Sequence, residues 1–364
     1  MKQARRSRLV ALLLVALLPL VQLAACAGPA YYGQAISGHF SLMRTRIPVA
    51  RLLEDSSTDP EFSARLRRAQ QILAFASDRL ALAADGSYSR VAFTGQDAVT
   101  WNVVAAGEFS VDPRLWCFPV AGCVPYRGYF DPGQAMEFAN KMRARGFDVM
   151  VSPAIAYSTL GWFEDPLLDT MLQYSDAQLA GIMFHELAHE RLYVKSDTAF
   201  SEAFAGFVEE VGVRLWMQET DQSAQNSDWG KRQSASVEFN RMLQDTRLKL
   251  QQVYASDLPI ETKRREKTLA FAALKDNYQN RVAGEWSGVD YFAVWMGSDL
   301  NNAHLALMNS YEGGNCAFTA LYEEAGRDLE RFYVLSEARA ALVGDRRKAW
   351  LEHPCLGAAH PPEL

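Results

Sequence analysis

The chain has 364 residues, of which 49% are hydrophobic, and its 37 Lys and Arg against 43 Asp and Glu give a net charge of -6. The acidic balance argues against nucleic acid as a partner, because phosphate binding requires a basic surface. The length allows one large domain or two small ones, and the apolar content is ample for a core.

The first 25 residues predict a signal peptide. Lys2, Arg5, Arg6 and Arg8 form a basic start, and the apolar run Leu9–Leu20 that follows is too short to span a bilayer comfortably. Removing this leader takes away four positive charges and no negative ones, so the net charge moves from -6 to -10. We expect residues 26–364 to form a single domain.

The leader ends in Leu23-Ala24-Ala25-Cys26, which resembles the lipobox of bacterial lipoproteins. The resemblance implies that Cys26 carries a lipid anchor. Ala27 follows it, not Asp, and by similarity to sorted lipoproteins this implies the periplasmic face of the outer membrane. Ordinary secretion with Cys26 as a spare thiol is the alternative. No other stretch is long and apolar enough to cross a membrane.

The segment before residue 156 predicts helices around a small antiparallel sheet. Ile36, Phe40, Leu42 and Met43 suggest a helix that packs on the body, and a second helix starts at Asp59-Pro60, with Arg65, Arg67 and Arg68 on its solvated side. Predicted strands are Arg90–Phe93, Thr100–Ala106, Glu108–Val111 and Phe147–Val151, with a helix over Asp131–Arg145 before the last of them. Val149–Ser158 reads either as an edge strand beside the site or as a plain core strand.

Cysteine usage fits an exported protein. Besides Cys26 the chain has Cys117, Cys123, Cys316 and Cys355. We expect a Cys117–Cys123 disulfide around a short Pro/Gly loop, which leaves Cys316–Cys355 as the second pair; free buried thiols are the alternative.

The strongest functional motif is His185-Glu186-Leu187-Ala188-His189, an HExxH. Residues four apart lie on one helix face, so both imidazoles can reach one metal ion, and Glu186 is placed to act as general base. Apolar flanks indicate a buried helix, where two His and a Glu are costly without a metal or partners. The motif predicts one Zn²⁺ with water in its fourth position.

A catalytic zinc needs a third protein ligand, and Glu202, Glu209 and Glu210 are the candidates. Residues 194–198 read as a turn between two helices, with Asp197 or Thr198 as the cap of the second. This short turn puts Glu202 nearest the two His. Glu209, two turns further on the same face, is the second choice, and Glu210 points elsewhere.

Residues 185–210 resemble the signature of a bacterial family described as zinc aminopeptidases, in which HELAH is followed by Y-V-K-x-D-T-x-F-[NS]-E-x-F-A. Residues 200–205 match the end of that run, and the similarity extends to Tyr126–Phe130, Ala156–Phe163 and Leu300–Ala303. It covers nearly all of the chain after the leader. The resemblance implies a gluzincin-like site with Glu202 as third ligand, a zincin-type fold and a peptide substrate.

The second half of the chain is mostly helical. Thr220–Gly230 reads as a polar linker, and Lys231–Ala255 with Ile260–Ala283 as a long solvated helical hairpin. A helix with an Asn cap is expected to begin within residues 300–304, and a closing helix is expected over Ala317–Leu335. His304 and Tyr311 are candidates for stabilising the oxyanion of an attacked carbonyl, although either could be structural.

These features predict an α+β, helix-rich, zincin-like metallopeptidase with a small, mostly antiparallel sheet and the hairpin over residues 220–283. The expected activity is zinc-dependent peptide hydrolysis in the periplasm, with Glu186 as base and His185, His189 and Glu202 as ligands. The alternatives are a non-catalytic envelope lipoprotein with a structural zinc, and a zinc amidase acting on cell-wall peptides.

Overall fold

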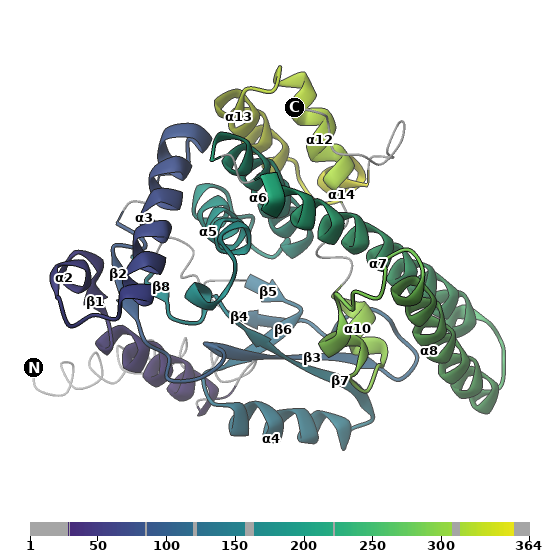
Figure 1. The fold of residues 1–364 in the computed structure, drawn as a ribbon. Helices are drawn as coiled ribbons and strands as arrows, with labels where there is room; N and C mark the ends of the chain where they lie inside the picture. Colours follow the sequence, from purple (N-terminus) through teal and green to yellow (C-terminus); the bar gives the residue numbers. More distant parts are fainter. Residues whose placement is uncertain are drawn as a thin grey trace, which may run out of the picture.

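The computed structural model describes Gly28 and residues 30–83, 86–118, 122–156, 164–220, 223–307 and 314–352. The predicted leader, Cys26, Tyr311 and Cys355 lie outside the described residues. The predicted α+β class is confirmed, because short sheets are surrounded by helices that make up most of the chain (Figure 1).

The first element of the described chain is a helix over residues 30–44, and β1 (Ile47–Pro48), α2 (Val49–Glu54) and α3 (Pro60–Leu80) follow. Helix α3 starts where the sequence predicts, because the Asp59 carboxylate accepts the Phe62 amide at 2.8 Å. The first helix does pack on the body through Leu42, which is 6% exposed. Ile36 and Phe40, also expected to pack inward, are 57% and 58% exposed and point away.

The strands form three small sheets instead of the single one expected. The central sheet has the order β6 (Tyr126–Tyr129), β3 (Thr100–Gly107), β7 (Phe147–Ala154), and both pairings are antiparallel. A hairpin of β4 (Trp116–Phe118) and β5 (Gly122–Val124) lies beside it. The third sheet joins β1 to β2 (Arg90–Ala92) and pairs β2 in parallel with β8 (Leu167–Leu168).

The strand expected over Glu108–Val111 is wrong. Residues 108–110 form a turn, in which the Ser110 amide donates to the Gly107 carbonyl. The Glu108 carbonyl, which a strand neighbour would have bonded, accepts instead from Lys267 and Asn302. Tertiary partners thus replace the ladder that the alternating pattern suggested.

The central sheet is covered on both faces. Helix α4 (Pro132–Arg143) packs Ala135 and Ala139 against Val103 on one face, and α10 (Asn302–Ala306) packs Ala303 against Val104 on the other. The largest apolar cluster lies elsewhere, where α3, α5 (Asp176–Arg191) and α6 (Thr198–Glu219) meet the C-terminal helices (Figure 1). A 3-10 turn at Met171–Gln173 leads into α5.

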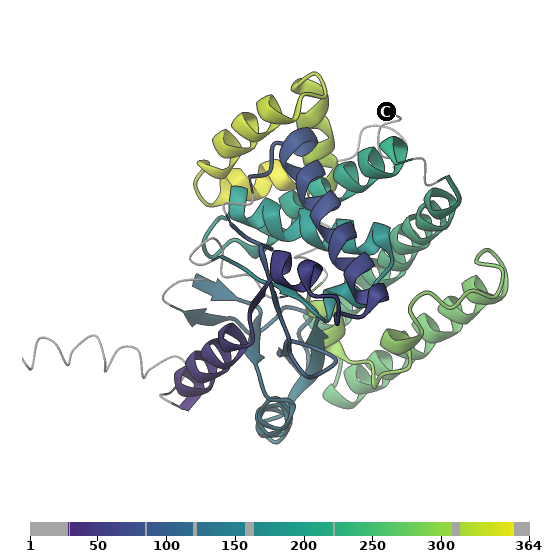
Figure 2. The same ribbon diagram turned by 60° about the vertical axis from the view of Figure 1, so that its left-hand side comes forward.

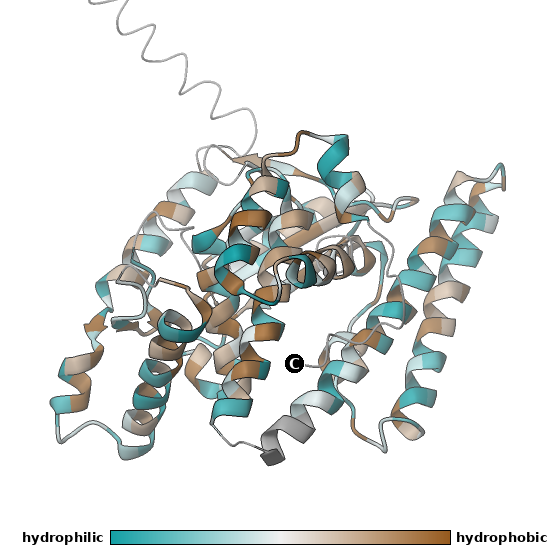
Figure 3. Cartoon of the chain, turned by 90° about the horizontal axis from the view of Figure 1, so that it is seen from above, coloured by the Kyte–Doolittle hydropathy of each residue, from teal (hydrophilic) through white to brown (hydrophobic). Residues whose placement is uncertain are grey.

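Helices α7 (Ser223–Ala255) and α8 (Ile260–Ala283) form the predicted hairpin, which stands beside the main body in Figure 3. The linker expected over Thr220–Gly230 is wrong, because α7 already begins at Ser223. A polar stretch without proline is compatible with a helix whose side chains remain in water. The short α9 (Ala293–Met296) follows the hairpin.

The predicted closing helix is interrupted. Helix α12 (Asn315–Glu324) ends before Gly326 and Arg327, which have φ of 74° and 61°, and α13 (Leu329–Ala340) restarts with Asp328 as cap. A short α14 (Asp345–Leu351) packs on both. Among the described helices, none combines the length and the apolar character that a membrane span requires.

Candidate metal centre

Helix α5 carries the HExxH, and local contacts fix where it starts. Ser175 and Gln178 form a capping box at its N-terminus. Arg65 donates to the Leu172 carbonyl at 3.0 Å and also pairs with Asp176 in the first turn of α5. The expectation that Arg65 and Arg68 are merely solvated is therefore wrong, since Arg68 too pairs with Asp176, at 2.8 Å.

Helix α6 starts at the predicted turn. The Asp197 carboxylate accepts the Phe200 amide at 3.1 Å, which makes Asp197 the N-cap. Arg347 of α14 holds the other Asp197 oxygen at 2.6 Å, and Ser201 Oγ accepts the Val194 amide at 3.0 Å. Several independent contacts thus set the angle at which α6 returns past the two histidines.

Two glycines let α5 and α6 approach closely. A Cβ on Gly181 would lie 3.0 Å from Glu209 Oε1, and one on Gly212 would lie 2.7 Å from the Phe184 ring. Larger residues at either position would separate the helices. The close approach brings acidic side chains of α6 within reach of the α5 imidazoles.

The ligand atoms of His185, His189 and Glu202 all lie within 4.8 Å of one another. The two histidine Nε2 atoms are 3.1 Å apart. Glu202 Oε2 is 3.3 Å from His185 Nε2, and Oε1 is 3.7 Å from His189 Nε2. The structure thus brings the three predicted ligands together, and Glu202, but neither Glu209 nor Glu210, belongs to this group.

Glu209 lies behind this group. Its Oε2 is 3.1 Å from His185 Nδ1, the nitrogen on the far side of the ring. A carboxylate there accepts the Nδ1 proton and leaves the Nε2 lone pair free for a metal. The corresponding Nδ1 of His189 is buried and has no hydrogen-bond partner in the described part of the chain. Glu210 pairs instead with Arg214, at 2.8 Å.

The electrostatics favour a positive charge at this point. Burial alone would lower the pKa of His185, but hydrogen bonds to Glu202 and Glu209 outweigh it and raise that pKa well above its ordinary value. Burial would raise the pKa of Glu202, but its hydrogen bonds to His185 and His189 lower it to about 2. The negative charge of Glu202 is therefore placed to neutralise a cation held between the imidazoles of His185 and His189.

Glu186 is set up differently from the ligands. Burial raises its pKa, the two histidines oppose that shift, and the negative charges of Glu202 and Asp165 add to it. A carboxyl whose pKa is raised toward neutrality is suited to accepting and returning a proton.

The donor set fits zinc. Two imidazole nitrogens and one carboxylate oxygen are the ligands of catalytic zinc sites that keep an open position. The hydrogen bond from His185 Nδ1 to Glu209 selects the tautomer that such a site needs. The group identified among the described residues has these three members, whereas a closed structural zinc site needs four.

Tyr126 and Tyr193 also lie near the group, and sequence reasoning did not select them. Burial raises the pKa of Tyr126, and the charge of Glu202 and then of Glu186 adds to the shift. Burial and Glu202 likewise raise the pKa of Tyr193, whose ring centroid is 6.2 Å from that of His189. Both phenols therefore stay protonated near the predicted ligands. The signal in the sequence that could have selected them is their place in two stretches that resemble the aminopeptidase family, residues 126–130 and 185–210.

His304, a predicted oxyanion candidate, is engaged in local hydrogen bonds. Its Nδ1 accepts the Asn301 amide at 3.2 Å within the predicted Asn cap of α10, and its Nε2 is 2.9 Å from Ser298 Oγ. Both ring nitrogens are engaged there, and Trp295 packs against the ring. These contacts fit the structural alternative for His304. Tyr311, the other candidate, lies outside the described residues.

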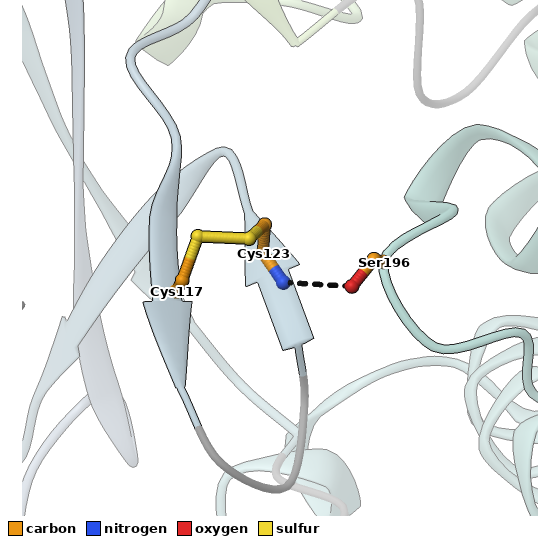
Figure 4. The surroundings of a disulfide bond; sticks show 3 residues. All are labelled: Cys117, Cys123 and Ser196. Atoms are coloured by element: carbon orange, nitrogen blue, oxygen red, sulfur yellow. Dashed lines mark hydrogen bonds between the residues drawn. A yellow bond between two sulfur atoms is a disulfide. The ribbon is translucent and has the colours of Figure 1, made fainter. Parts of the chain in front are cut away.

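The predicted Cys117–Cys123 disulfide is present and joins β4 to β5. This hairpin contacts the turn between α5 and α6, where the Cys123 amide donates to Ser196 Oγ at 3.1 Å (Figure 4). Gly122 is needed there, because a Cβ would lie 2.3 Å from the same oxygen. Cys316 is also disulfide-bonded, and its expected partner Cys355 lies outside the described residues.

No curated protein and no solved structure matches the chain. One family model, described as "Putative aminopeptidase", matches residues 30–351, which is most of the sequence. The match includes His185, His189 and Glu202, which together are called the metal group. The chain belongs to that aminopeptidase family.

Proposed function

We propose that this protein is a zinc-dependent aminopeptidase. The observation that carries the proposal is the convergence of His185, His189 and Glu202 on one point, with Glu186 beside the first ligand. The family name supports peptide hydrolysis. When bound, zinc supplies a water of lowered pKa and polarises the scissile carbonyl.

The side chains divide the remaining work. Glu186, whose pKa is raised, takes a proton from the attacking water and returns it to the leaving amine. Glu209 holds His185 in the ligating tautomer. The neutral phenols of Tyr126 and Tyr193 are better placed than His304 to donate to an oxyanion on the attacked carbonyl.

The test is Glu186→Gln on the purified chain, with zinc content and hydrolysis of aminoacyl anilides measured together. We expect full zinc occupancy and a loss of turnover of about 10²–10⁴-fold, the usual contribution of a general base. Glu190→Gln is the matched control: it lies one turn further on α5, and its amide can still accept the Ser87 hydroxyl that now donates to it at 2.9 Å. Unchanged turnover in Glu186→Gln would refute the mechanism.

N-blocked peptides in the same assay separate exopeptidase from endopeptidase action, because an aminopeptidase requires the free amine. Cleavage of cell-wall peptides without cleavage of aminoacyl anilides would assign the amidase reaction instead. Zinc binding without any hydrolysis would favour the structural role.

We also propose that Cys26 is lipidated and that the protein faces the periplasm from the outer membrane. The basic and apolar leader and the lipobox-like Leu23–Cys26 support this location. The Cys117–Cys123 disulfide supports an oxidising compartment. Mass spectrometry of the mature N-terminus, with Cys26→Ser as control, tests the anchor.

A further inference from the structure

The helix over residues 30–44 is fastened to the body along one face. The Gln34 amide bonds the Gly128 carbonyl and the Phe130 amide, both at 3.2 Å, along the free edge of β6. The Arg127 guanidinium lies 4.0 Å from the centre of the Tyr31 ring. A Cβ on Gly38 would lie 2.3 Å from the Phe130 ring, so the helix lies directly against this part of the sheet.

The opposite face of the same helix is apolar and exposed. Ile36 and Phe40 are one turn apart, and 57% and 58% of their surfaces are exposed. The other exposed positions on the helix after Ala30 are Gly33, Ser37, Ser41 and Arg44. Two large apolar side chains therefore project together from a surface whose other exposed residues are glycine, two serines and, at the end of the helix, Arg44.

The charge of this stretch of the sequence differs from that of the whole protein. The chain has 43 acidic residues, yet none precedes Glu54. Arg44, Arg46 and Arg51 are the charged residues between Gly28 and Leu53. An apolar helix face in a stretch of chain whose only charged residues are basic suits a membrane surface with anionic lipids.

The distance to the proposed anchor is short. Four Cα-to-Cα steps separate Cys26 from Ala30, which span at most about 15 Å when fully extended. A lipid on Cys26 would therefore hold the first turn of this helix at the headgroups. Figures 1 and 2 both show the helix on the side of the central sheet away from the α7–α8 hairpin, so the hairpin does not cover it.

We propose that the Ile36 and Phe40 face of the N-terminal helix lies in the membrane interface and fixes the orientation of the enzyme on the bilayer. This inference rests on the proposed anchor at Cys26 but not on the peptidase activity. The occupant of the face is the bilayer that holds the lipid. Because Gln34 and Tyr31 tie the helix to the sheet, the whole body would take a defined angle to the membrane.

The test uses the lipidated full-length protein in vesicles of phosphatidylethanolamine and anionic phosphatidylglycerol. A nitroxide is attached to Phe40→Cys or Ile36→Cys without reductant, and the unsubstituted protein reports any background labelling. The matched control is Val334→Cys, whose side chain is 61% exposed. Val334 belongs to α13, a helix that lies far from residues 30–44 in Figures 1 and 2. The readout is the rate at which the nitroxide collides with oxygen, which enters lipid, divided by its rate of collision with a polar nickel complex, which does not enter lipid.

We expect the ratio of oxygen to nickel accessibility at positions 36 and 40 to rise several-fold on vesicles over that of the soluble Cys26→Ser protein. The ratio at position 334 should not change. Equal ratios at all three positions in lipid-anchored protein would overturn the proposal. Shielding of position 40 in native envelopes but not in these vesicles would assign the face to a protein partner and overturn it too. Absence of lipid on Cys26 would remove its premise, while the anilide assay on the same sample tests the peptidase proposal separately.

Discussion

Glu209→Gln is the most informative single substitution, because it tests a role that depends on tertiary structure alone. Glu209 contacts the metal group only through His185 Nδ1, at 3.1 Å. Glutamine keeps an oxygen that can accept the Nδ1 proton but removes the charge. Carboxylates in this outer position typically contribute 10–100-fold to metal affinity, or about 1.4–2.7 kcal/mol.

The expected loss lies at the lower end of that range. The Glu209 side chain is 38% exposed, so water screens part of its charge. We expect zinc affinity to fall about tenfold in Glu209→Gln, and further in Glu209→Ala, where His185 loses its acceptor altogether. Glu202→Ala, which removes a ligand, should abolish stoichiometric binding.

The assay is a competition titration of zinc against a chelating indicator. Glu210→Gln is the matched control, because this neighbour on α6 pairs with Arg214 and not with a histidine. Gly181→Ala provides a second perturbation: its Cβ would press on Glu209 Oε1 and shift the carboxylate without changing its charge. Affinities of Glu209→Gln and Glu209→Ala that stay within about twofold of wild type would refute the outer role.

Two further predictions concern the support of the fold. Replacing Cys117 and Cys123 by Ser should lower the free energy of unfolding by about 2 kcal/mol, from the closure entropy of this short loop, which urea unfolding measures. The same change should weaken zinc binding, because the turn loses the support of Ser196. A zinc titration that gives the wild-type affinity would contradict this second effect. Burial lowers the pKa of His304 from 6.5 to about 4, so its stabilising effect is complete above pH 6.5 and is lost as the pH falls toward 4. Over that interval we expect the unfolding free energy to drop by up to about 3 kcal/mol more in wild type than in His304→Gln, and identical pH profiles would show that His304 does not titrate in this way.

The sequence was most informative where the deciding contacts are local. The HExxH places two imidazoles on one face by helix geometry alone, and the caps at Asp59, Asp197 and Asn301 lie where the pattern predicts them. The Cys117–Cys123 pair was also predictable, because only a short loop separates the two residues. Glu202 followed from the length of the turn before it.

The sequence was least informative where partners distant in sequence determine the conformation or the contacts of a residue. Glu108 leaves a strand because residues more than 150 positions away take its carbonyl. His304 turns inward to a cap and a serine, although a lone His near an Asn-rich stretch could equally have faced a cleft. The sequence offers Glu209 only as the second choice of metal ligand, because spacing shows the helix face on which it lies but not the histidine nitrogen that it contacts. That nitrogen is Nδ1 of His185.

The turn between α5 and α6 explains why a disulfide hairpin lies next to the metal group. Ser196 has φ of 65°, a left-handed conformation that disfavours residues with a Cβ by about 1–2 kcal/mol. Such a conformation persists where several contacts impose it, and here the Cys123 amide binds Ser196 Oγ while Arg347 holds Asp197 next to it. The position of Glu202 relative to His189 depends on this turn, because Glu202 lies only five residues beyond Asp197. Removing the disulfide should therefore affect zinc affinity more than an equally destabilising change in the α7–α8 hairpin does, and that difference separates support of the site from general stability.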